Sequence, residues 1–507
     1  MRLDTVTVAA VTAKMEGGSP VPRRRLIFGV ILALLLGAMV PPSATAAPPG
    51  FKTSQPPAAV ALVPNVTIDP LLTAGDVVGA YQASGTMDGL GFYRSSNSSI
   101  ELLIDHELAN KVRDPVNATD NFDARVSHLT LSNPGRISAA EYALDGSEGF
   151  IWFCSGNLTV LDGTPWFFTG EEDQNYFSPH GGTTIAIDAT DPSTYRVLNH
   201  FGYMAHEQEL PILGLDGATF LLPEDNPGTV FAGTTTPNIS QLYSYTASDW
   251  GSAIDGTGQL GVFVPDGTFS DGNPSTNDIH KGETLTGHFA PLDQATDNAN
   301  QQALEAAAQA AGAFDFVRLE DVTQSRTQPG VAYFADTGRI GRETVRGRVY
   351  QLALDPADPT QAKLSVLLDG DAGDPIINPD NLAASSKALI IQEDRNAEHR
   401  FAAGVGSSLL KPGESPYSLM YVYTFGNGKL RAVARPDTLA SLIPARGQGD
   451  WESSGITDAS SLWGKGWWLF DVQMHHTSVG QPDTATLTPN ATTGESAQLL
   501  RVYIPGT

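Results

Sequence analysis

The sequence has little cysteine, little positive charge and few long apolar runs. Cys154 is the one cysteine among 507 residues, so no intrachain disulfide can form. Lysine and arginine number 30 against 56 aspartates and glutamates, which gives a formal net charge of −26 at pH 7. A chain this acidic repels phosphate backbones, so we expect no nucleic-acid partner. Stability must come from the hydrophobic core, for which this length is sufficient, and from bound metals.

The apolar run over residues 26–40 is about fifteen residues long, whereas roughly twenty are needed to span a bilayer. Arginines 23–25 precede this run and the small residues 44–46 follow it, a pattern typical of a cleaved export signal. Residues 1–46 are therefore predicted to be a signal peptide, either of the ordinary or of the twin-arginine type. We expect a mature chain that begins at Ala47, is secreted or periplasmic, has no stable membrane anchor and is monomeric.

Glycine and proline are abundant, at 51 and 34 residues, and they separate short apolar stretches over most of the chain. Alternation of apolar and polar residues predicts strands within 239–247, 347–355, 418–434 and 498–505. The turn FGNGKL inside the third of these stretches predicts a hairpin. We therefore predict an all-β fold, a β-propeller formed by residues 76–507 as one domain, with a double β-sandwich as the alternative.

Two segments depart from this pattern. Residues 298–314 are rich in alanine and glutamine and predict a helix of about three turns. The polar, turn-rich stretch 266–297 before them predicts a long loop, so that 266–314 would form a small helical and loop insertion, an arm on the propeller. At the N-terminus, residues 47–75 are rich in proline and alanine and are predicted to be an extended lead-in.

Several short motifs contain acids, a thiol or an arginine near the ends of predicted strands. Cys154 precedes the run GTPWFFTGEED (163–173). This run contains a short predicted strand and ends in Glu171, Glu172 and an aspartate. Five further motifs follow a fixed order along the chain: LLIDHEL (102–108), MAHEQE (204–209), VRLEDV (317–322), INPDNLA (377–383) and WESSGI (451–456). In residue types and order, these motifs resemble those of the PhoX-type alkaline phosphatases.

The acids in these motifs also carry a physical prediction. Five carboxylates from separated stretches would meet at the axis of a propeller: Glu172, Glu207, Glu320, Asp380 and Glu452. Like charges held close together raise one another's pKa values, and bound cations are the natural compensation. Oxygen ligands suit calcium, magnesium, manganese or ferric iron, whereas a thiolate indicates a transition metal.

The resemblance implies a fold, a site and an activity. It implies six blades, calcium and ferric iron as cofactors, and phosphate monoesters as small-molecule substrates, hydrolysed for phosphate scavenging. It implies that the metal ligands are Cys154, toward iron, with Glu172, Glu207, Glu320, Asp380 and Glu452. It further implies that Arg318 clamps the phosphate with a two-pronged contact and acts in catalysis with Glu320.

Neighbouring residues and other functions leave alternatives. Adjacent residues on a strand point to opposite faces, so we expect Glu172 and not Glu171 to enter the site. Asp394 has two equal interpretations: it enters the site, or it forms a salt bridge with Arg395 or Arg400. The alternatives to a phosphatase are another propeller hydrolase, such as a phytase or lactonase, and a non-catalytic secreted propeller that binds calcium for stability.

Overall fold

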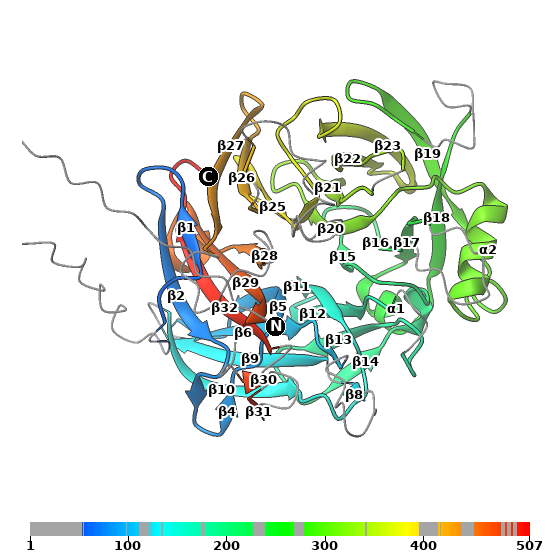
Figure 1. Ribbon diagram of the computed structural model, residues 1–507. Coiled ribbons are helices and arrows are strands. Elements are labelled where there is room, and N and C mark those ends of the chain that lie inside the picture. The colour runs from blue at the N-terminus through cyan, green and yellow to red at the C-terminus, as the bar shows by residue number, and fades with distance from the viewer. Residues whose placement is uncertain are drawn as a thin grey trace, which may run out of the picture. The chain divides into compact units, whose positions relative to one another are not determined.

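Short apolar stretches between turns form antiparallel sheets that stand around a common centre (Figure 1). This computed structural model describes residues 53, 55–97, 99–110, 121–122, 124–132, 135–173, 178–226, 239–267, 278–339, 342–394, 414–415, 417–437, 451–477, 482–483, 488–489 and 494–507. All of them belong to the unit Ala47–Thr507, and the predicted signal peptide lies outside them. The fold is all-β and the arrangement is that of a β-propeller, as predicted.

One strand of each sheet unit lies at the centre of the ring. These inner strands are β5 (Met87–Arg94), β11 (Phe153–Leu161), β15 (Leu210–Pro211), β20 (Leu319–Gln324), β24 (Pro379–Ala384) and β28 (Trp451–Asp458). β28 contacts β5, β5 contacts β11, β15 contacts β20, and β24 contacts both β20 and β28. Residues far apart in the sequence are thereby brought to one axis.

The outer strands follow each inner strand in chain order. β5 is followed by β6 (Ser99–His106), β9 (Arg125–Ser132) and β10 (Arg136–Leu144), and β11 by β12 (Thr164–Glu171), β13 (Thr184–Asp188) and β14 (Tyr195–Val197). β24 is followed by β25 (Ala388–Glu393), β26 (Met420–Thr424) and β27 (Lys429–Pro436), and β28 by β29 (Trp467–Thr477) and β32 (Gly494–Tyr503). The short pairs are β3 (Val77–Val78) with β4 (Tyr81–Gln82), β7 (Ala109–Asn110) with β8 (Asn121–Phe122), and β30 (Pro482–Asp483) with β31 (Thr488–Pro489).

The remaining sheet has nine strands and joins two such units. Its order is β15, β16 (Ala218–Pro223), β17 (Leu242–Ala247), β18 (Gln259–Pro265), β19 (Thr284–Pro291), β23 (Asp358–Asp369), β22 (Arg348–Asp355), β21 (Val331–Asp336) and β20. β19 pairs with β18 on one side and with β23 on the other. Because this sheet is continuous, the six blades implied by the resemblance stay a prediction. The strands predicted from alternation correspond to β17, β22, β26, β27 and β32, and β26 and β27 form the predicted hairpin.

The N-terminal lead-in takes part in the sheets. β1 (Ala59–Ala61) pairs with β27, and β2 (Thr67–Thr73) pairs with β32. Leu71 and Leu72 are fully buried, so this stretch contributes to the core and is more than an extended lead-in. Strands from near both ends of the chain thus share one sheet, which closes the ring and covers strand edges.

The helix predicted over 298–314 is α2 (Gln301–Ala311). Asn300 caps it, because its side chain accepts a hydrogen bond from the Ala303 amide at 2.9 Å, and Gly312 ends it in the left-handed region at φ 81°. The loop predicted over 266–297 is wrong for 284–291, which form β19. Hydrogen bonds to two neighbouring strands stabilise this segment, and its sequence shows no sign of them.

The other helical segments are short: α1 (Trp250–Ile254), α3 (Ser460–Trp463) and the 3-10 turn Asn199–Phe201. No helix among the described residues has the length and apolar character needed to cross a membrane. Apolar clusters fill the space between neighbouring sheets; in one of them Ile390 and Val422 pack with Trp468 and Phe470.

The inner strands approach one another closely. A Cβ added at Gly89 of β5 would lie 1.8 Å from the Gly156 amide nitrogen of β11. No side chain fits there, so glycine is required at position 89 if the two strands are to meet as they do. This contact brings the first residues of β5 and β11, which include Asp88 and Cys154, next to each other.

Candidate metal centre

Five candidate ligands occupy the same place in their strands. Asp88, Cys154, Glu320, Asp380 and Glu452 are each the second residue of an inner strand. In all five strands the pairing with the next strand shifts register just after this position or within two residues of it. Such irregularities re-aim side chains next to active sites. The starts of these five inner strands therefore direct candidate ligands to the axis.

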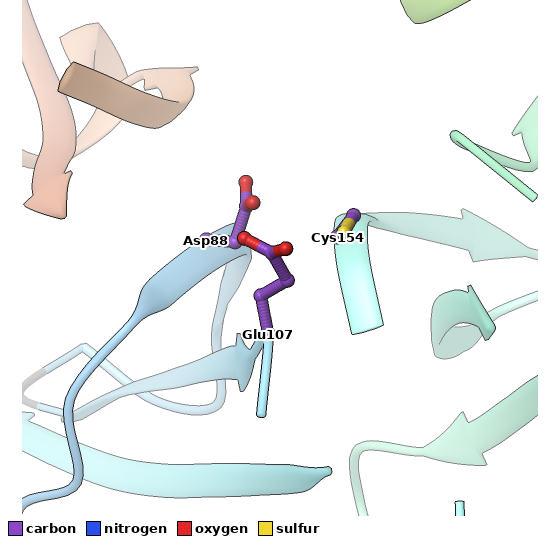
Figure 2. Close-up of side chains that lie close together, drawn as sticks. All are labelled: Asp88, Glu107 and Cys154. Atoms are coloured by element: carbon purple, nitrogen blue, oxygen red, sulfur yellow. The ribbon is translucent and has the colours of Figure 1, made fainter. Parts of the chain in front are cut away.

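Cys154 lies between two groups of carboxylates. Its Sγ donates a hydrogen bond to Glu172 Oε2 at 2.7 Å, and one atom each of Cys154, Glu172 and Glu207 lie within 4.8 Å of one another. On its other side, Cys154 forms a second group of this size with Asp88 and Glu107. Figure 2 shows the Glu107 carboxylate turned toward Cys154 and the Asp88 carboxylate beside it; Asp88 stands near the start of β5, and Glu107 directly follows β6. The thiol could thus be shared between two bound ions.

A third group lies where β24 and β28 begin. Ligand atoms of Asp380, Asp394 and Glu452 lie within 4.8 Å of one another. Asp380 and Glu452 are both predicted site residues, and the structure brings them together. Asp394, which follows β25, belongs to this group, so its position favours the site over a purely structural ion pair.

Arg318 connects the candidate ligands with a further acid. Its Nε and Nη2 donate to the two carboxylate oxygens of Asp225 at 3.1 and 2.6 Å, and Nη2 also lies 2.9 Å from Glu320 Oε1. Arg318 and Glu320 therefore lie on one face, as alternation predicts. The two-pronged edge of the guanidinium is, however, occupied by Asp225. Among the described residues, no hydrogen bond engages Nη1, which leaves this nitrogen to meet a ligand.

Burial and crowding make the ionised forms costly. Burial raises the pKa of Glu207 well above its usual value, and Glu320 and Glu172 raise it further. Burial and the neighbouring acids, Glu107 and Glu172 among them, likewise raise the pKa of the Cys154 thiol. Burial, then Glu452 and Asp394, raise the pKa of Asp380. One guanidinium among so many acids leaves two ways to hold the site together, protonation or bound cations.

The donor set fits bound metal ions. Glu207 is 4% exposed, and its Oε2 has no hydrogen-bond partner among the described residues. A buried carboxylate oxygen without a hydrogen-bond partner destabilises the fold unless a bound ion or a proton satisfies it. The oxygens suit hard cations such as calcium and ferric iron, and the thiol suits iron better than calcium.

The adjacent glutamates at the end of β12, Glu171 and Glu172, point to opposite faces, as expected. Glu172 faces Cys154. Glu171 faces away, where its carboxylate accepts hydrogen bonds from Ser178 Oγ at 2.6 Å and from the amides of Ile151 and Thr183 at 3.1 and 3.2 Å. The period of two in an extended chain accounts for this difference.

Sequence reasoning did not assign Asp88, Glu107 or Asp225 to the site. Glu107 stands in the LLIDHEL motif, from which no metal ligand was predicted. Asp88 is the second residue of its strand, as the other candidates are of theirs, and it directly precedes the close-packed Gly89. This position is the signal that could have identified it. Asp225 gives no local signal, because only the tertiary contact with Arg318 shows its role.

Neither a protein family nor a curated protein matches this sequence. Among solved structures, the chain is similar to an α-L-arabinanase from Penicillium chrysogenum complexed with arabinobiose, at 10% identity and a TM-score of 0.37, over 82% of this chain and 93% of that one. It is also similar to the hemagglutinin-neuraminidase ectodomain of parainfluenza virus 5, at 13% identity and a TM-score of 0.34, over 86% of each chain.

An α-L-arabinofuranosidase from Lactobacillus brevis is similar over 72% of this chain and 93% of that one, at 8% identity and a TM-score of 0.32. Scores this low carry no argument about chemistry, which must come from the residues of this chain.

Proposed function

We propose that this protein is a metal-dependent hydrolase and that it acts on phosphate monoesters, as PhoX-type alkaline phosphatases do. One observation carries the proposal: carboxylates and a thiol from separate sheets converge at the ring centre beside the guanidinium of Arg318. The combination of clustered hard oxygen donors with an arginine suits an anionic substrate held between cations and a guanidinium.

The residues divide the work by position. Cys154, Glu172 and Glu207 would hold one ion, and Asp380, Asp394 and Glu452 another. When bound, such ions supply Lewis acidity toward a phosphoryl group.

Arg318 would donate from Nη1 to a phosphoryl oxygen, as charge builds there in the transition state. Asp225 and Glu320 keep the guanidinium charged and fix its orientation. The surrounding burial excludes water and strengthens each of these contacts.

The proposal is tested by release of p-nitrophenol from p-nitrophenyl phosphate. The mature chain is loaded with calcium and iron and compared in calcium and in a chelator. We expect turnover in calcium and its loss in the chelator. The folded, metal-loaded protein without turnover on this ester would contradict the phosphatase.

The alternative, another hydrolase, is tested in the same assay with p-nitrophenyl α-L-arabinofuranoside and a lactone. A glycosidase uses a carboxylic acid with a raised pKa as its general acid, and burial raises the pKa of Glu207. Cleavage of the arabinoside, unchanged by chelation and with no phosphatase activity, would establish that alternative.

A further inference from the structure

Gln473 of β29 contacts two acids of the metal centre at once. Its side chain is fully buried, and its Nε2 donates hydrogen bonds to Asp88 Oδ2 at 2.9 Å and to Glu107 Oε2 at 3.1 Å. Asp88 stands in β5 and Glu107 directly follows β6, and both strands belong to a neighbouring sheet. One nitrogen of the sheet formed by β2, β32, β29 and β28 thus holds two acids that lie more than three hundred residues away in the sequence.

The two acceptors fix the orientation of this amide. An amide nitrogen has two hydrogens and can serve both carboxylates, whereas the reverse orientation would place an oxygen against two negative charges. The oxygen of Gln473, Oε1, is left buried and has no hydrogen-bond partner in the described part of the chain. A buried acceptor without a partner destabilises the fold, and such groups call for a functional reason. The contacts of Nε2 with the two acids supply that reason.

The acids that Gln473 contacts belong to a group of candidate ligands. Ligand atoms of Asp88, Glu107 and Cys154 lie within 4.8 Å of one another. Two carboxylates this close repel each other, so a donor that bridges them keeps them together before an ion binds. In the register of its own sheet, Gln473 is also paired with Glu452, an acid of the third group. Gln473 therefore stands beside acids of two separate groups.

We propose that Gln473 is a positioning residue of the metal centre, which holds Asp88 and Glu107 at the spacing at which they bind an ion together with Cys154. It acts through the two acids. The inference rests on the metal centre of the proposed function and not on the phosphate ester as its substrate. Replacing a residue that orients metal ligands typically weakens metal binding about 10- to 100-fold.

A titration with cobalt(II) tests this role, because a thiolate is a good ligand for this transition metal and the bond between them absorbs light. The mature chain, freed of metal, is titrated in the Glu207→Gln background, which weakens the other group that shares Cys154. Gln473→Met keeps the length of the side chain but cannot donate, and we expect it to raise the Kd for cobalt about 10- to 100-fold. Gln473→Asn, which is one methylene shorter and cannot keep both contacts, should also raise the Kd.

Gln392→Met is the matched control. Gln392 of β25 is equally buried and also has an Oε1 without a partner among the described residues. Its Nε2, however, donates to the backbone oxygen of Ser454 at 3.0 Å and not to an acid. Both methionine variants should lower the melting temperature, whereas only the variants of Gln473 should weaken cobalt binding.

The outcomes separate the positioning role from the metal centre itself. An unchanged Kd for cobalt in the folded variants of Gln473, or an equal rise of the Kd in Gln392→Met, would overturn the positioning role. Absence of cobalt–thiolate absorption in the Glu207→Gln chain, before any change at Gln473, would overturn the metal centre and this inference together.

Discussion

Two sets of buried acids in this protein have the same residue types and similar burial but different surroundings. Asp336 at the end of β21 accepts hydrogen bonds from the amides of Val317, Arg318 and Gly338, each at 3.0 Å. Glu393 at the end of β25 accepts them from Ile377 and Leu419 at 2.7 and 2.9 Å.

These acids at the ends of second strands, with Glu171, hold loops in place through backbone donors. The acids of the metal centre face one another and the Cys154 thiol instead. An acid and its burial therefore do not identify a functional group by themselves. The partners do, because backbone amides satisfy one set, whereas side chains such as Ser454 and Gln473 satisfy the other set only in part, and cations or protons are needed for the rest.

Arg318 lies at the border of the two sets, since its amide donates to Asp336 and its side chain to Asp225. Arg318→Ala should reduce turnover of p-nitrophenyl phosphate about 10²- to 10³-fold, as loss of one charge-stabilising donor does in other enzymes. Steady-state kinetics and metal analysis at a temperature where the variant is folded would measure this. Arg318→Lys keeps the charge, and its failure to recover any activity would indicate that geometry matters more than charge.

Normal turnover in Arg318→Ala would show that the guanidinium has only a structural role. Removal of the arginine also breaks its buried ion pair with Asp225, which costs about 3–5 kcal/mol of stability. Thermal unfolding separates this loss from the loss of turnover.

Replacing an acid by its amide should change the free energy of unfolding differently in the two sets when it is measured in chelator. Glu393→Gln should lower the free energy of unfolding by about 1–3 kcal/mol, because an amide cannot accept both backbone hydrogen bonds. Glu207→Gln should leave it unchanged or raise it, because one repelling carboxylate is removed. Thermal unfolding of both variants in chelator measures the difference.

In calcium, Glu207→Gln should bind less metal than the unchanged protein, and Glu393→Gln should bind the same amount. Equal losses of stability in the two variants would contradict the division into two sets.

The smallest expected effect is on pH dependence. Burial raises the pKa of Glu171 to about 7 and that of Asp336 to about 6, from 4.5 and 3.8. The folded state then binds protons that the unfolded state has released, so this stabilisation is complete below about pH 4 and is lost as pH rises to about 7. In chelator, the melting temperature should fall over this range, and Glu171→Gln should reduce the slope. A melting temperature that rises between pH 5 and 7 would contradict these shifts.

Much of the fold followed from local sequence. Alternation predicted β17, β22, β26, β27 and β32, and the helix α2 was expected from its alanines and ends at a glycine in the left-handed region. The lead-in and β19 were missed as strands, because their hydrogen bonds go to segments distant in sequence. Local propensity is weak for such strands, and pairing decides.

The candidate site was predicted in part. Glu320 contacts Arg318 and belongs to none of the three groups of possible metal ligands, which do contain the other predicted ligands, Cys154, Glu172, Glu207, Asp380 and Glu452. Strand alternation correctly separated Glu172 from Glu171. The two-pronged contact expected of Arg318 is not available to a ligand, because Asp225 occupies that edge. Asp225 lies 93 residues from Arg318 in a segment without a motif, so spacing could not reveal the pair.

Sequence alone is enough to predict an acidic, β-rich chain with one thiol and a set of acids near strand ends, whereas in the structure Glu320, Asp380 and Glu452 each stand second in an inner strand. Residue type and the period of an extended chain are local properties, so they can be read without a structure. Which acids meet each other, and which meet backbone amides, can be seen only in the folded chain. That choice depends on how the sheets close into a ring, which brings residues hundreds of positions apart within hydrogen-bonding distance, as between Ser454 and Asp88.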